Sequence, residues 1–141
     1  MPINRSLPTQ VREQIEEVLC QRIKTLYSQK LDHQPTHVTC QLFNEQLAIV
    51  IEGSVTQPEK VLINNGNPEL AQQVRLDLNK VIQTQMQQII EDVLGVPVID
   101  LLSDATLETG RTGLIVVLAT SPQTGIADES VMVSSDSIQP M

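Results

Sequence analysis

Three acidic residues and one arginine are the strongest candidates for chemistry in this sequence. Asp100, Asp104 and Glu108 lie close together, near an expected connection between two strands, and Arg75 lies on the preceding helical segment. Carboxylates in such a group can bind a hard cation or act as a general acid and base. A small ion-binding protein or hydrolase is therefore one hypothesis. Acidic side chains in a solvent-exposed loop are the more common explanation of the same pattern.

The segment "DHQPTHVTC" contains four residues of metal-binding types, Asp32, His33, His37 and Cys40. Its two histidines have the spacing of a helical ligand pair, but Pro35 between them disfavours a helix. On a strand, His37 and Cys40 would point to opposite faces, because they are an odd number of positions apart. We therefore expect no metal and no cofactor, with solvated histidines and a buried Cys40.

The segment "SVTQPEKVL" raises the same question about Thr56 and Glu59. Their spacing is that of a capping box, in which the threonine hydroxyl and the glutamate carboxylate bond to free amides at the start of a helix. It predicts a short helix over residues 58–63, ended by the "NNG" turn. Catalysis by Glu59 with Lys60 is disfavoured, because adjacent helical residues point about 100° apart. We expect a structural role.

Composition argues against several classes of function. The formal net charge is -8, the nine Lys and Arg residues are scattered, and the chain has one Tyr and one Phe. Nucleic-acid binding normally needs a basic surface and aromatic stacking. No apolar stretch approaches the roughly 20 residues of a membrane span, and no phosphate-binding loop or nucleophile motif is present. The sequence thus predicts a cytoplasmic protein with no catalytic residue and no direct membrane insertion.

Two long amphipathic helices must position these residues. Ser6 is expected to cap the first, which ends before Pro35, and Asn67 with Pro68 begins the second, which ends at Gly95. The apolar stripe of the first helix is expected to contain Val11, Ile15, Val18, Leu19, Ile23 and Leu26. That of the second is expected to contain Leu70, Val74, Leu78, Val81, Ile82, Ile89, Val93 and Leu94.

Two strand pairs complete the expected fold. The first is a hairpin over residues 38–51 with its turn at Asn44 and Glu45, and the second pairs "VPVIDLL" with "GLIVVLAT" through the connection "SDATLETGRT". The order α-β-β-α-β-β predicts an α+β fold, a two-layer sandwich in which two long helices cover one face of a four-stranded antiparallel sheet. Residues 1–121 form the single domain, and residues 122–141 form a flexible acidic tail.

The strands "LAIVI" and "GLIVVLA" are apolar at consecutive positions, so both of their faces require cover. Two helices can cover only one face of the sheet. We therefore expect a homodimer or a protein partner on the second face or on an edge strand.

The segments "GSVTQPEKVLINNGNPELAQQVR" and "GVPVIDLLSDATLETG" resemble the bacterial MpsC-like family over roughly residues 8–120. One departure is "DHQP", where the family often has a Gly-rich G-x-G-P turn and this chain keeps only Pro35. The positions that match the family pattern are Thr56, Glu59, Leu62, Arg75, Gly95, Val98, Ser103 and Asp104.

The resemblance implies a non-enzymatic, cytosolic accessory or regulatory protein that binds a protein partner. The family name links it to a sodium-dependent membrane-potential system similar to bicarbonate-uptake machinery, so the chain would be peripheral to a membrane transport complex. The resemblance implies no catalytic residue. Because the pattern includes Arg75 together with Ser103 and Asp104, we expect the arginine to hold the loop that contains these two residues by charge-assisted hydrogen bonds.

Overall fold

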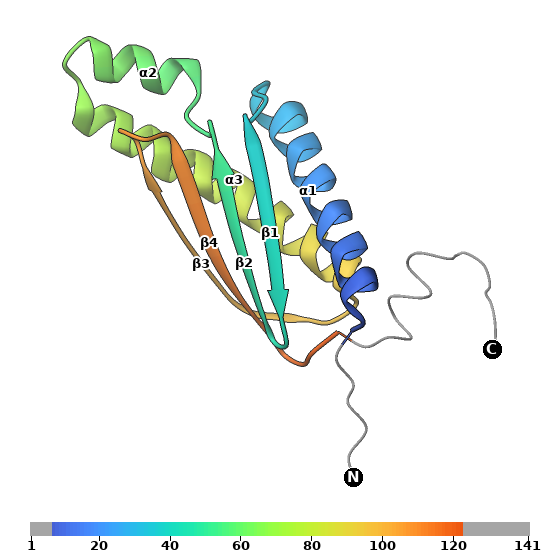
Figure 1. Ribbon diagram of the computed structural model, residues 1–141. Helices are drawn as coiled ribbons and strands as arrows, with labels where there is room; N and C mark the ends of the chain where they lie inside the picture. The colour runs from blue at the N-terminus through green and yellow to red at the C-terminus, as the bar shows by residue number, and fades with distance from the viewer. Residues whose placement is uncertain (1–6, 123–141) are drawn as a thin grey trace.

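The computed structural model describes residues 7–122 (Figure 1). The α+β class and the four-stranded antiparallel sheet predicted from the sequence are confirmed. The element order includes, in addition, the short helix expected after the capping box. The elements are α1 (Thr9–Leu31), β1 (His37–Phe43), β2 (Gln46–Glu52), α2 (Gln57–Asn64), α3 (Pro68–Leu94), β3 (Val98–Thr106) and β4 (Arg111–Leu118).

The sheet has the strand order β1-β2-β4-β3, and every neighbouring pair is antiparallel. The β1–β2 hairpin turns at Asn44 and Glu45 as predicted, and Asn44 adopts φ 54°. Asparagine tolerates this left-handed conformation better than most residues, so the turn residue and the register agree. The sequence-distant strand β4 then inserts between β2 and β3.

Helices α1 and α3 lie against the same face of the sheet (Figure 1). The short helix α2 lies at one end of the molecule and, within residues 7–122, packs only against α3. The opposite face of the sheet is not covered by any described element. Residues 7–122 therefore form a two-layer structure with one open sheet face.

The core forms between the helices and alternate residues of the strands. Leu47, Ile49 and Ile51 of β2 are at most 1% exposed. Their cross-strand partners on β4 are Val116, Leu114 and Thr112, respectively. The residues between them, Ala48 and Val50, point to the open face. Consecutive apolar residues in these strands thus serve two different faces.

The first helix begins later than predicted. It starts at Thr9 with Pro8 as its N-cap residue, so Ser6 is not the cap. Proline also suits this position because its missing amide leaves no donor unsatisfied. Val18 was expected in the buried stripe but is 44% exposed, since the stripe that faces the sheet runs through Ile15, Leu19 and Ile23.

The second long helix has the predicted bounds and ends at Gly95, whose φ of 73° is the left-handed conformation typical of a helix C-terminus. Its predicted apolar face is partly wrong. Leu70 and Val81 are more than half exposed. The residues of α3 that are buried are Ala71, Arg75, Ile82, Met86, Ile90, Val93 and Leu94. The predicted stripe contained only apolar residues, whereas the buried face of α3 also includes the charged residue Arg75.

Strand β3 is longer than predicted and runs through Thr106, so Ser103 and Asp104 lie on a strand and not in a loop. The turn between β3 and β4 is limited to residues 107–110. Apart from Pro122, the acidic tail predicted for residues 122–141 lies outside the described residues.

Candidate functional site

The capping box predicted at the start of α2 is present. The Thr56 backbone N–H and the Thr56 hydroxyl both donate to Oε1 of Glu59, each over 2.9 Å. Glu59 is fully buried, whereas Lys60 beside it is exposed, as expected for neighbours on a helix. The glutamate therefore does more than cap a surface helix: it brings a carboxylate into the interior.

Arg75 of α3 neutralises this buried carboxylate. Its Nε donates to Oε2 of Glu59 over 2.8 Å, and its Nη2 donates to Oε1 over 2.7 Å. Only 3% of Arg75 is exposed. A bidentate arginine–carboxylate pair is among the strongest side-chain interactions, and burial makes each partner depend on the other. This ion pair fixes α2 against α3.

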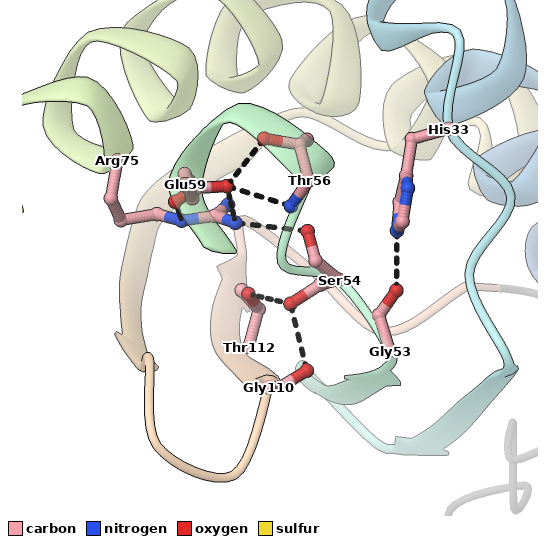
Figure 2. Close-up of polar contacts among 8 residues, drawn as sticks. All are labelled: His33, Gly53, Ser54, Thr56, Glu59, Arg75, Gly110 and Thr112. Carbon is pink, nitrogen blue, oxygen red and sulfur yellow. Dashed lines mark hydrogen bonds and ion pairs between the residues drawn. The ribbon is translucent and has the colours of Figure 1, made fainter. Parts of the chain in front are cut away.

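The same cluster joins the helices to the sheet (Figure 2). Arg75 also donates to the Ser54 carbonyl oxygen over 2.9 Å. The Ser54 hydroxyl lies 3.1 Å from the carbonyl oxygen of Gly110 and 2.7 Å from the hydroxyl of Thr112 on β4. The segment between β2 and α2 is thus bonded to α3 and to the β3–β4 hairpin.

The connection between α1 and β1 is bonded to the same segment. His33 Nε2 lies 2.6 Å from the carbonyl oxygen of Gly53 (Figure 2). Gly53 has φ 66°, and a Cβ atom there would overlap the hydroxyl of Thr36. Glycine is required at this position for both reasons. His33 therefore has a structural hydrogen bond.

Tyr27 of α1 completes the buried polar cluster. Burial raises the pKa of Tyr27, and the charge of Arg75 and the hydroxyl of Thr112 only partly offset this effect. Beside Tyr27 and Thr112 is a cavity of about 10 Å³, which Ser103 also lines. A volume of this size is about that of one water probe, so it cannot admit a substrate.

The expected contact between Arg75 and the Ser103–Asp104 pair is wrong. Among the described residues, the ion-pair partner of Arg75 is Glu59. The carboxylate of Asp104 instead accepts a hydrogen bond from the amide of Ala105. The reason is that Ser103 and Asp104 are adjacent on a strand: Ser103 points to the helical layer, and Asp104 points to the open face.

The four residues of the hydrolase or ion-binding hypothesis do not converge on one site either. Asp100 and Asp104 are exposed on β3, Glu108 lies in the β3–β4 turn, and Arg75 lies on the other side of the sheet. The groove between α1 and α3, of about 730 Å³, is lined by none of these four residues. Their geometry offers no shared position for a reacting atom.

The side chains of metal-binding types within residues 32–40 also lie apart from one another. His37 is exposed at the start of β1, whereas Cys40 is buried, as predicted. Within residues 7–122 no group of three or more His, Cys, Asp or Glu side chains could hold a metal ion. Burial raises the pKa of the Cys40 thiol, and neighbouring Cys20 raises it further. Both cysteines are free thiols in the core.

The open face of the sheet is the second notable feature. We call Ala48, Val50, Leu102, Ile115 and Val117 the open-face patch. Ala48, Ile115 and Leu102 are direct cross-strand neighbours on β2, β4 and β3. Leu102 is 61% exposed and Ile115 is 49% exposed. Adjacent apolar side chains across three strands are typical of an interaction surface, whereas single exposed ones are not.

Sequence reasoning missed Ser54, Thr112 and Tyr27 as partners of the capping box. The available signal was Arg75, a charge inside an otherwise apolar helical stripe. Such a residue is buried only when it has a partner, and the two nearest preceding acids in the chain are Glu69 and the capping-box Glu59. The serine and threonine offer no spacing pattern that links them.

The buried ion pair and the uncovered face together define a small α+β protein with a closed polar interior and an open sheet face. The chain belongs to the MpsC family, described as "Na+-translocating membrane potential-generating system (MpsC)", whose model matches residues 11–120. The chain matches no curated protein and no solved structure. No helix within residues 7–122 combines the length and the apolar character needed to cross a bilayer.

Proposed function

We propose that this chain is a non-enzymatic, cytoplasmic accessory protein of a sodium-linked membrane system, to which it binds by contact with a protein partner. The family description supports the link to such a system. The partner contact is supported by the open-face patch, which carries the proposal. We place the chain at the periphery of the membrane complex.

The buried cluster supports a role without catalysis. Both carboxylate oxygens of Glu59 are bonded, and Arg75 is bonded to Glu59 and to the main chain of Ser54. Catalytic groups need access to a substrate, and this ion pair is at most 3% exposed. The cluster therefore serves to hold α2, α3 and the sheet together.

The open face supports a protein partner over a second copy of the chain. On this face Glu52 and Arg111 pair with each other over 3.7 Å, and among the described residues Asp100 and Asp104 have no ion-pair partner. The whole chain has a formal net charge of -8. Like charges oppose self-association. The homodimer expected from the sequence remains a prediction, and sedimentation equilibrium over micromolar concentrations tests it.

The test is affinity purification from the native cell followed by mass spectrometry. Wild-type chain should capture subunits of the sodium-linked membrane system, and Ile115→Lys should lose them because a lysine interrupts the open-face patch. Val61→Lys is the matched control, since Val61 on α2 is 52% exposed and distant from the sheet face. The same experiment without residues 123–141 separates any contribution of that segment.

A functional measurement accompanies the purification. In a strain lacking the chain, sodium-dependent membrane potential should fall, and it should be restored by wild type and by Val61→Lys but not by Ile115→Lys. Equal capture of the same subunits by all three folded proteins would show that the open-face patch does not bind the partner. Loss of capture by both variants would point to instability instead, which circular dichroism detects.

A further inference from the structure

The two edges of the sheet differ in how their backbone groups are satisfied. At β1, the amide of Leu42 donates to Oε2 of Glu16 over 2.8 Å, and Sγ of Cys20 donates to the carbonyl oxygen of Val38 over 3.2 Å. Both partners are on α1, which packs against β1. Helix α1 thus covers this edge and blocks the addition of another strand.

The β1 contacts also show which residues of β3 direct their backbone N–H and C=O groups to the outer edge of the sheet. In an antiparallel sheet, each residue directs its N–H and C=O groups to the same neighbour, and successive residues alternate. The backbone N–H of Leu42 points away from β2, so the same alternation of backbone groups can be followed through the register from β1 to β3. It places the backbone groups of Leu101, Ser103 and Ala105 on the outer edge.

A direct contact agrees with this assignment. The amide of Ala105 donates to Oδ1 of Asp104 over 2.8 Å, so it does not face β4. At the other end, the amide of Val98 donates to Oε2 of Glu91 over 2.8 Å. Within residues 7–122 no further strand pairs with β3. The open part of the edge is therefore the short stretch of Leu101 and Ser103.

The side chains beside this stretch have a definite charge pattern. Asp100, Leu102 and Asp104 alternate along β3, and all three are exposed on the open face. Leu102 adjoins Ile115 of the open-face patch. A strand that pairs with this edge would have an acidic, an apolar and an acidic side chain of β3 opposite its own alternate residues.

Resting on the proposed function, we propose that the partner supplies an extended segment that pairs antiparallel with β3. This segment has basic side chains opposite Asp100 and Asp104 and an apolar side chain opposite Leu102. Main-chain hydrogen bonds with Leu101 and Ser103 provide binding, and the side-chain pattern provides selectivity. The basic residues also neutralise the two charges that the rest of the face leaves unbalanced.

This chemistry distinguishes the partner from the chain itself. If two copies paired through β3 about a twofold axis at Leu102, Asp100 of one would lie opposite Asp104 of the other. Like charges directly opposite each other destabilise a strand pair. Residues 123–141 contain no lysine or arginine, so they do not have the required pattern.

The test uses the full chain and a capped nine-residue peptide with lysine at its third and seventh positions, valine at its fifth and threonine elsewhere. Addition of about 1 mM peptide should shift the amide NMR signals of Leu101 and Ser103 and slow their hydrogen exchange. A peptide of equal composition with lysine at the fourth and sixth positions should bind about tenfold more weakly, because its charges face the other side.

Two controls test the backbone and the charges. N-methylation of the fourth and sixth peptide residues should abolish binding, since their amides pair with Ser103 and Leu101, whereas N-methylation of the fifth should weaken it far less. The double variant Asp100→Lys/Asp104→Lys should reverse the preference, so that a peptide with glutamate at the third and seventh positions binds better than the lysine peptide.

Absence of any shift at Leu101 and Ser103, or equal binding of the two lysine peptides, would overturn the proposed strand addition. The proposed function has a separate readout. Capture of membrane-system subunits that depends on Ile115 but is unchanged in the Asp100→Lys/Asp104→Lys variant would leave the open face as the binding site and refute the role of the β3 edge.

Discussion

Both carboxylate oxygens of Glu59 accept hydrogen bonds from Arg75, at 2.8 Å from Nε and 2.7 Å from Nη2, in the interior of the protein. The two residues lie on different helices and are 16 positions apart in the chain. The capping-box glutamate of α2 is therefore also the counter-ion of α3. Its loss should affect more than the end of one helix.

Removal of one partner should strongly destabilise the fold. Glu59→Gln or Arg75→Met leaves an uncompensated buried group and should cost about 3–5 kcal/mol, a large part of the stability of a typical domain. The double variant should lose much less than the sum of the two single losses, because no unpaired charge remains. Urea unfolding of the three variants measures the coupling. Additive losses would show that the pair is not energetically coupled.

Thr56→Ala tests the cap separately from the ion pair. The substitution removes the hydroxyl that bonds to Glu59 and should cost about 1 kcal/mol, as lost helix caps typically do. Capture of the partner by the folded variant should be unchanged, because Thr56 is buried at the start of α2 and away from the open face. A stable Thr56→Ala protein that no longer binds the partner would show that this segment has a direct binding role.

Adjacent residues of β4 should respond in opposite ways to the same substitution. Val116 is completely buried, so Val116→Lys places a charge in the core and should unfold the protein. Val117 points to the open face, where Val117→Lys should preserve the fold and weaken partner binding. Circular dichroism and affinity purification report the two effects. Normal partner binding by folded Val117→Lys would argue against the open-face patch.

Stability should fall at alkaline pH. The pKa of the Cys40 thiol and that of the Tyr27 hydroxyl are raised in the folded protein, chiefly by burial. Above about pH 8.5 the unfolded chain releases the thiol proton, whereas the folded chain retains it, so the unfolded state gains stability as pH rises. Each group can contribute at most about 1.4 kcal/mol per pH unit. Below about pH 8.5 both groups are protonated in the folded and the unfolded state, so their full contribution to stability is present there.

Urea midpoints between about pH 7 and about pH 10 check this prediction. Cys40→Ala should be less stable at neutral pH, because it leaves a cavity, but its stability should decline less steeply with pH. Val38→Ala serves as the control for a cavity near the same site, because Val38 is buried on the same face of β1 and carries no thiol. A decline in Cys40→Ala as steep as in wild type would mean that Cys40 does not cause the alkaline loss.

The features that the sequence by itself determined are those made by neighbours along the chain. The capping box joins Thr56 to a residue three positions ahead, and the turn at Asn44 and the end of α3 at Gly95 depend on the backbone preferences of single residues. Such interactions have fixed spacings. The helix bounds near them and the class of fold could therefore be predicted before any tertiary contact was known.

Only the tertiary structure decided the partners and faces that depend on packing. Ser54 meets Thr112, which is 58 positions later, and no sequence pattern specifies that contact. The arginine of α3 could have paired with any nearby acid. It binds Glu59 because α2 folds back on α3, whereas Asp104 lies beyond the sheet. Likewise, the period of α3 was visible, but the stripe that became buried was set by the position of the sheet and by the ion pair.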